Sequence, residues 1–463
     1  MAIKIKMNHQ IHYFCSYLMK TMTRKLIVLG YFLCSIMGMA QIYKPIDTAD
    51  YIQRKTFLKN FEGNNEATVK RLKSQYSGKT GTELSKIYKE FGTDFGKQVK
   101  NKDFIFKSEF ETSIQSMIQR LKKNNPKIPQ DLKILIAKDN TPNAYCLADG
   151  TFVINMGLYS WLNNEEQIAA VISHELGHKI EEHSLKTFLK IIEQDKLDKV
   201  VVENIKSTTT NRSQSQNQKA FDILKNTVYK KGVERRQSEM QADSLGYVIF
   251  KNSDFKKAEF VNALQRLQDF DTISPRTLKV DTYKKLYNLP KQAFNEKWMK
   301  KEDFSLYNYN FYKEKLNKDS LASHPEVSRR IDMLKKTFAE LKTPVSPEKP
   351  SDLFLTLRKT ARMEILPNYF HSEDYGLGIY TAMQFLQDEE EEKYYKGWLG
   401  RCFSKIYEAR KNYNLNRYLD RIEPKNQSES YQQFLNFMWN LSLDEIKNIA
   451  DFYQTNETIA KVN

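Results

Sequence analysis

Hydrophobic residues recur at three- and four-residue steps over much of the chain, which is typical of helices with one buried face. Residues 41–125 follow this pattern almost throughout, and we expect this segment to be helical. Its two clearest apolar faces consist of Leu84, Ile87, Tyr88, Phe91 and Phe95, and of Phe110, Ile114, Met117, Ile118 and Leu121. Pro126 and Pro129 then interrupt the pattern, because proline lacks the N–H group that a helix requires.

Residues 132–155 carry a different pattern, in which short apolar runs alternate with turn residues. Residues 132–137 predict one strand, and Asp149 with Gly150 predicts the turn before a second strand. The second strand consists of Thr151, Phe152, Val153, Ile154 and Asn155. We expect it to be a sheet edge that binds an extended peptide substrate through backbone hydrogen bonds, although an ordinary core hairpin fits the same pattern.

The segment 163–183 combines a helix start signal with a helical apolar face. Asn163 and Glu166 have the spacing of a capping box, in which side chains satisfy the free backbone N–H groups of the first turn. Apolar residues then follow at helical spacing, namely Ile168, Val171, Ile172 and Leu176. We therefore expect a helix that begins next to Asn163 and buries this face.

Two histidines on this predicted helix have the spacing of metal ligands. His174 and His178 are four residues apart, so they project from one side and could both reach one metal ion. Glu175 lies beside them, where it could act on a metal-bound water. His183 lies five residues beyond His178 and, at about 100° per residue, leaves that side of the helix. We expect His183 to be a solvated surface residue and not a ligand.

A second cluster of acidic residues could supply the third metal ligand that the first motif lacks. A catalytic zinc ion takes three protein ligands and a water, and the predicted helix provides only two of them. Glu239 and Asp243 are four residues apart within a helical pattern, so both face one way. Glu239 could be the third ligand, and Asp243 could hydrogen-bond the far nitrogen of a ligating histidine.

These residues resemble a family of zinc metallopeptidases that includes the HtpX-like membrane proteases, the CaaX prenyl endopeptidases, the mitochondrial Oma-type proteases and periplasmic quality-control proteases of outer-membrane assembly. Four motifs of the family occur in order and cover about residues 130–340. They are Asn143-Ala144-Tyr145 with Asn155-Met156-Gly157-Leu158, His174-Glu175-Leu176-Gly177-His178, Glu239-Met240-Gln241-Ala242-Asp243, and Ser323-His324-Pro325 with Arg330-Ile331. The Pro-Gly-Gly usual in the substrate-edge loop of the family is replaced by Ala148-Asp149-Gly150.

The resemblance implies a gluzincin fold of the α+β class, predominantly helical with a small sheet. It also implies one Zn2+ per chain, bound by His174, His178 and Glu239, with Glu175 as the general base. The branch with several membrane helices differs from this chain, which is more similar to the soluble exported branch.

The last motif of the resemblance offers two further candidates. By their positions in it, His324 or Arg330 would stabilise the oxyanion of the reaction. His324 would also lie near the metal, where a loop histidine gates the site in related proteins. A histidine before a proline is equally typical of a structural helix start.

The length of the chain suits two or three domains. We expect a signal peptide at residues 1–40, a metallopeptidase domain at 41–342 with its catalytic core at 130–340, a linker at 343–350 and a helical region at 351–463. The linker prediction rests on Pro344, Pro347 and Pro350. The C-terminal helices show no 34-residue repeat, so both a partner-binding module and a plain stabilising extension remain open.

The first forty residues have the features of a targeting segment. Positive charge at Arg24 and Lys25 precedes a short apolar run, and Gly38 and Ala40 are the small residues that a signal peptidase requires. We expect cleavage after Ala40 and an exported protein, either periplasmic or secreted. No later stretch approaches about eighteen apolar residues, so we expect no transmembrane helix in the mature chain.

Charge and cysteine content add two limits. The net charge is +16, and it falls to +11 without residues 1–40. Because the lysines are spread along the chain, the charge favours a basic exported protein over a nucleic-acid binder. Only Cys146 and Cys402 remain after cleavage, and the sequence leaves open whether they form a disulfide.

The sequence therefore favours a zinc metalloendopeptidase that cleaves proteins of the cell envelope, as in protein quality control. One alternative is a chaperone-like binding protein that works through its helical C-terminal region and has a gated or vestigial zinc site. The intact Glu175 argues against that alternative, because inactive sites tend to lose the base. Another alternative is a zinc hydrolase that acts on bonds other than peptide bonds. The expected edge strand favours a peptide substrate instead, because backbone pairing suits an extended chain.

Overall fold

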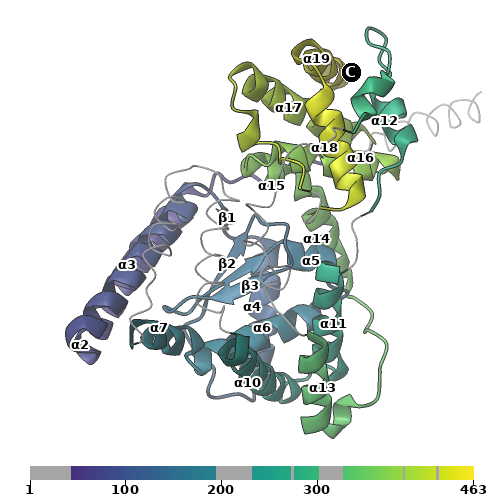
Figure 1. The fold of residues 1–463 in the computed structure, drawn as a ribbon. Helices are drawn as coiled ribbons and strands as arrows, with labels where there is room; N and C mark the ends of the chain where they lie inside the picture. The colour runs from purple at the N-terminus through teal and green to yellow at the C-terminus, as the bar shows by residue number, and fades with distance from the viewer. Residues whose placement is uncertain are drawn as a thin grey trace, which may run out of the picture. The chain divides into compact units, whose positions relative to one another are not determined.

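The computed structural model describes residues 43–193, 232–272, 276–301, 327–388, 390, 392–423 and 427–462 (Figure 1). The expected signal peptide and His324 lie outside the described residues. By its contacts the chain divides into the units Met1–Lys44 and Pro45–Asn463, and every element named below belongs to the second unit.

Three helices lie within residues 41–125, where the apolar spacing predicts helical structure. They are α2 (Tyr51–Gln75), α3 (Gly78–Lys100) and α4 (Glu109–Lys122), and α2 packs along α3 (Figure 1). The start of α4 is set by Ser108, whose side chain accepts a hydrogen bond from the backbone N–H of Glu111. The prediction missed β1 (Phe104–Ile105), since two residues are too few to show an alternating pattern.

The strands β1, β2 (Lys133–Ala137), β3 (Ala144–Cys146) and β4 (Thr151–Asn155) form one mixed sheet in the order β1-β2-β4-β3. β4 runs parallel to β2 and antiparallel to β3, and all its residues are buried. An inner strand with both faces covered is mostly apolar, which explains the central run Phe152-Val153-Ile154. The sheet edge that we expected at Thr151, Phe152, Val153, Ile154 and Asn155 is therefore wrong, because β3 occupies that edge.

The next elements are α5 (Gly157–Trp161), α6 (Glu165–Ile180), α7 (His183–Glu193), α10 (Gly232–Lys251), α11 (Ala258–Thr272), α12 (Val280–Tyr287), η1 (Glu296–Met299), α13 (Val327–Thr337) and η5 (Ala339–Leu341). The cap of α6 differs by one residue from the expected one. Its N-cap is Asn164, whose side chain accepts a 2.9 Å hydrogen bond from Gln167 N. Gln167 Oε1 in turn accepts a 2.9 Å hydrogen bond from Asn163 N.

Helix α6 is buried on all sides, where we expected one buried face. Every residue from Gln167 to Gly177 is buried. The cause is its place in the fold, because α4, β3, α10 and α11 all pack against it (Figure 1). The helix that carries the metal motif is therefore held rigidly within the main hydrophobic core.

The C-terminal region is helical, as expected. It consists of α14 (Asp352–Met363), α15 (Ile365–His371), α16 (Tyr375–Gln387), α17 (Glu392–Lys411), η6 (Leu415–Arg417), α18 (Glu429–Asn440) and α19 (Leu443–Val462). Helix α17 packs against both α16 and α19 through buried apolar and aromatic residues. Together with the four-stranded sheet, these elements make the chain α+β and predominantly helical.

The expected linker at 343–350 and helix α14 after it both contact the catalytic core. α14 belongs to the catalytic core, since its Phe354 ring lies 5.7 Å from the Tyr159 ring and Arg358 Nη2 donates to Leu162 O at 2.6 Å. The segment 343–350 is also tied to this core, because Asn164 Nδ2 donates to Glu348 O at 3.0 Å. The segment therefore makes a direct contact with the catalytic core.

The segment that carries α12 and η1 packs on C-terminal helices, although we expected it within the catalytic core. The ring of Tyr287 stacks on that of Phe437 with centroids 4.7 Å apart. Trp298 Nε1 donates to Glu445 Oε1 at 2.9 Å. Segments far apart in the sequence thus share one core.

Two further observations concern the cysteines and the membrane. Cys146 and Cys402 are both free thiols. Over the described part of the chain, each helix is either too short or too polar to cross a lipid bilayer.

Candidate active site

Helix α6 presents His174 and His178 from one side. Their Nε2 atoms are 3.1 Å apart, and their rings meet at 81° with centroids 4.7 Å apart. This follows from the helix itself, since residues four apart are neighbours on its surface. Glu175 follows directly in the chain and is also buried, at 7% exposure.

Helix α10 brings Glu239 to the same point. Glu239 Oε2 lies 3.6 Å from His174 Nε2, and Oε1 lies 3.5 Å from His178 Nε2. Two glycines permit this approach of α10 to α6. A Cβ atom on Gly177 would lie 2.6 Å from Ala242 O, and a Cβ atom on Gly246 would lie 2.8 Å from Ser173 O.

The three side chains fit a zinc ion. Tetrahedral zinc with ligands at about 2 Å requires ligand atoms that are about 3.3 Å apart. The observed separations between His174, His178 and Glu239 are 3.1, 3.5 and 3.6 Å. Two imidazoles and one carboxylate are also the donor set of a catalytic zinc site that leaves one position open. Within the described residues, these three form a group that could hold one metal ion.

Asp243 fixes the orientation of His174. Its Oδ1 atom lies 2.9 Å from His174 Nδ1, which directs Nε2 toward the other two ligands. Burial alone raises the pKa of Asp243, but the charge and hydrogen bonds of Arg330, together with His174, lower it to about 2. Asp243 therefore remains a carboxylate that can accept the Nδ1 proton of His174.

Arg330 of α13 holds the carboxylates of the site. Its Nε and Nη2 atoms donate to Asp243 at 2.6 and 2.7 Å, and Nη1 lies 3.0 Å from Glu239 Oε2. We expected Arg330 to stabilise the oxyanion of the reaction. In the structure its guanidinium is buried against two carboxylates. It therefore positions the metal ligand Glu239 and also Asp243, which orients the ligand His174. His324, the other oxyanion candidate, lies outside the described residues.

The prediction of a solvated His183 is wrong. His183 is 2% exposed, and its Nδ1 atom lies 2.9 Å from His178 Nδ1. The helical angle does not apply to it, because α6 already ends at Ile180 and His183 begins α7. Sequence reasoning missed this residue, and its only signal was a third histidine close to the motif.

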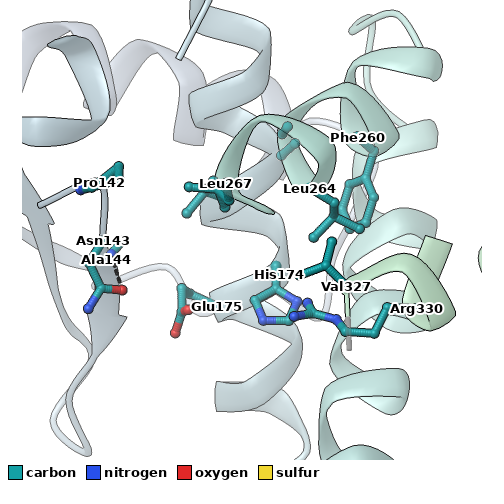
Figure 2. A pocket seen from close by; sticks show the side chains of 13 residues that line it. Pro142, Asn143, Ala144, His174, Glu175, Phe260, Leu264, Leu267, Val327 and Arg330 are labelled. Atoms are coloured by element: carbon teal, nitrogen blue, oxygen red, sulfur yellow. Dashed lines mark hydrogen bonds between the residues drawn. The ribbon is translucent and has the colours of Figure 1, made fainter. Parts of the chain in front are cut away.

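An apolar cleft adjoins His174 and Glu175 (Figure 2). Figure 2 shows Glu175 between the strand side, which carries Asn143 and Ala144, and the wall formed by α11. That wall contributes Phe260, Ala263, Leu264 and Leu267, and α13 contributes Val327 and Arg330. The role of α11 left no sequence signal, because these residues have the spacing of an ordinary buried helix face.

Comparison with known protein families agrees with this geometry. Residues 108–338, about half of the chain, match Peptidase family M48. The match includes all three metal-binding side chains, Glu175, and the helices α6, α10, α11 and α13. No curated protein matched the chain. From the family match and the zinc-binding geometry together, we conclude that the chain belongs to peptidase family M48 and is a zinc metallopeptidase.

Proposed function

We propose that this metallopeptidase is an endopeptidase that cleaves proteins of the cell envelope. The observation that carries the proposal is the position of Glu175, which lies beside the metal-binding histidines and lines the apolar cleft. Zinc held by His174, His178 and Glu239 would lower the pKa of a water molecule and polarise the substrate carbonyl. Glu175 would accept a proton from the attacking water and pass it to the leaving amine.

The edge strand β3 is the proposed site for the substrate backbone. Among the described residues β3 pairs only with β4, and Leu147 N donates to Thr151 O at 2.8 Å at one end of that pairing. In an antiparallel pair the backbone groups of alternate residues point away from the partner strand. The N–H and C=O of Cys146 therefore point to the open side of β3, where an extended peptide could pair.

The cleft supports a preference for an apolar substrate side chain. Phe260, Leu264 and Leu267 line it on the side opposite to Asn143 and Ala144 (Figure 2). A peptide paired along β3 would pass between this wall and Glu175, and one of its side chains would enter the cleft. Burial of that side chain in apolar surroundings would favour Val, Leu, Ile, Met or Phe.

The cellular setting is proposed from the sequence. Residues 1–40 have the features of a signal peptide, which supports export and substrates in the envelope. Backbone pairing along an edge strand depends little on side-chain identity. Such tolerance suits an enzyme of protein quality control, which must accept many misfolded chains.

The test uses the chain from Gln41 onward, with zinc measured by elemental analysis and casein as substrate. We expect one zinc per chain and cleavage that a chelator abolishes and added zinc restores. Glu175→Gln should retain zinc but reduce kcat by about 10²- to 10⁴-fold, because only the proton acceptor is removed. Glu66→Gln, on the exposed surface of α2, is the matched control and should cleave normally.

Two results would contradict the proposal. Undiminished cleavage by Glu175→Gln would remove this residue from the reaction. Zinc bound by the wild type without cleavage of any protein would favour the chaperone-like alternative. The envelope setting has its own test, since an uncleaved chain found in the cytoplasm by fractionation and mass spectrometry would exclude it.

A further inference from the structure

His178 has one ring nitrogen toward the metal ligands and the other toward His183. Its Nε2 atom lies 3.1 Å from His174 Nε2 and 3.5 Å from Glu239 Oε1. Its Nδ1 atom lies 2.9 Å from Nδ1 of His183, a residue that is 2% exposed. His183 is therefore placed behind the metal ligand and is not itself a member of the ligand group.

A tight turn brings His183 to this position. α6 ends at Ile180, α7 begins at His183, and Glu182 between them has a left-handed backbone with φ 53°. Because a non-glycine residue rarely adopts this conformation, the surrounding structure must compensate its cost. The turn ends α6 before His183, and the His183 ring lies against the ring of His178.

The contact between the two rings fixes where their protons lie. A neutral imidazole that binds zinc through Nε2 carries its proton on Nδ1. The Nδ1–H of His178 can then donate only to an acceptor, and the Nδ1 lone pair of His183 lies at hydrogen-bonding distance. His183 must in turn carry its own proton on Nε2.

Gln241 completes this arrangement. Its Oε1 atom lies 3.1 Å from His183 Nε2, a distance at which Oε1 accepts a hydrogen bond from the Nε2–H group of His183. Gln241 belongs to α10, two residues after the ligand Glu239. Every nitrogen of both rings thus has one consistent role, and the contacts tie α6 and α7 to the helix that carries the third ligand.

We propose that His183 and Gln241 are positioning residues for zinc binding, which hold His178 in the required tautomer and orientation. Asp243 and Arg330 do the same for His174. One zinc-binding histidine is thus supported by a carboxylate and the other by a neutral imidazole. The proposal rests on the zinc site and not on the identity of the substrate.

The test compares two substitutions of His183 in the chain from Gln41 onward. In His183→Asn, Oδ1 takes the place of Nδ1 and keeps an acceptor for His178, whereas His183→Leu fills similar space without one. Zinc affinity is measured by competition with a chromophoric chelator. We expect His183→Leu to weaken zinc binding by about 10- to 100-fold and His183→Asn to remain close to the wild type. The readout is independent of peptide cleavage, so it stands even if the proposed substrate is wrong.

The melting temperature of the metal-free protein separates positioning from packing. Similar melting temperatures of the Asn and Leu variants, with different zinc affinities, would support the positioning role. Equal zinc affinities of the two variants would overturn the positioning role. This holds both if the two affinities match that of the wild type and if they decrease together with the melting temperature.

If the His183 variants fail to fold, Gln241→Met decides, because Gln241 is exposed and its substitution should leave the hydrophobic core unchanged. It should weaken zinc binding by removing the acceptor for His183 Nε2, and an unchanged zinc affinity would overturn the proposal.

Discussion

Gly246 of α10 lies directly against the backbone of His174, so that a Cβ atom at position 246 would lie 2.8 Å from the His174 Cα atom. Real Cβ atoms do not come this close to backbone, so only glycine permits the observed spacing of α6 and α10. The same spacing sets the distance from His174 to Glu239, which α10 also carries. A backbone position without a side chain therefore controls the geometry of the metal site.

Gly246→Ala should force α10 away from α6. We expect a loss of about 1–3 kcal/mol in the free energy of unfolding, as for other overpacked sites, and weaker zinc binding. Gly96→Ala is the matched control, because a methyl group on the helical Gly96 would meet no atom within 4 Å, and alanine should stabilise α3 by about 1 kcal/mol. Urea unfolding and zinc titration measure both effects. Equal zinc affinities of the two variants would disprove the role of Gly246.

Asp243 should make the stability of the metal-free protein depend on pH under acidic conditions. Its pKa is about 2, below the ordinary value of 3.8. A pKa lowered by folding stabilises the protein above about pH 4, and this stabilisation is lost as the pH falls toward 2. Asp243→Asn should remove this dependence, and urea unfolding at a series of pH values measures it.

The same substitution leaves Arg330 buried with one carboxylate partner fewer. At pH 7 we expect Asp243→Asn to lower the free energy of unfolding by about 3 kcal/mol. Asp254→Asn is the control, because its 2.8 Å ion pair with Arg120 is exposed and should contribute less than about 1 kcal/mol. Similar losses for the two variants would show that burial of the Asp243 pair has no special effect.

Cys146→Pro tests whether the substrate pairs with β3. Proline removes the N–H that points to the open side of the strand but leaves the hydrogen bonds to β4 intact. We expect kcat/KM for peptides to fall about tenfold, the loss of roughly one hydrogen bond of 1.5 kcal/mol. Cys146→Ala keeps the N–H and serves as the control. Equal kcat/KM for both variants would argue against pairing at this residue.

Leu264→Ala tests the apolar cleft. The shorter side chain enlarges the cleft at its α11 wall. The kcat/KM of peptides with Phe next to the scissile bond should therefore rise relative to that of peptides with Val. The shift in relative kcat/KM should be about tenfold, which corresponds to one or two methylene groups of contact. A parallel loss for all peptides would indicate damage to the fold rather than altered specificity, and an unchanged ratio would place the substrate side chain elsewhere.

A chain that ends at residue 342 should not fold independently, although the linker pattern suggests a domain boundary there. It would lose Phe354 from the catalytic core and Phe437 from its contact with Tyr287. Exposure of both apolar surfaces should abolish cooperative thermal unfolding. Circular dichroism with temperature measures this for the truncated and full chains. A cooperative transition in the truncated chain would restore the expected boundary.

The sequence alone was sufficient for the local chemistry of the site. His174 and His178 are neighbours because a helix brings residues four apart to one side, whatever surrounds it, and Glu175 directly follows His174 in the chain. The need for a third zinc ligand indicated Glu239 with Asp243, and the resemblance of the motifs supported both. The helical regions were equally predictable, since apolar spacing reports one helix at a time.

Tertiary structure decided whatever depends on how separate elements meet. It placed β3 rather than β4 at the sheet edge, directed Arg330 to the carboxylates, and turned His183 back to His178. None of these follows from spacing, because strand order, helix packing and a left-handed turn residue are determined by contacts between distant parts of the chain. The chemistry of the zinc site is thus encoded locally, while its support and its substrate path arise only from packing.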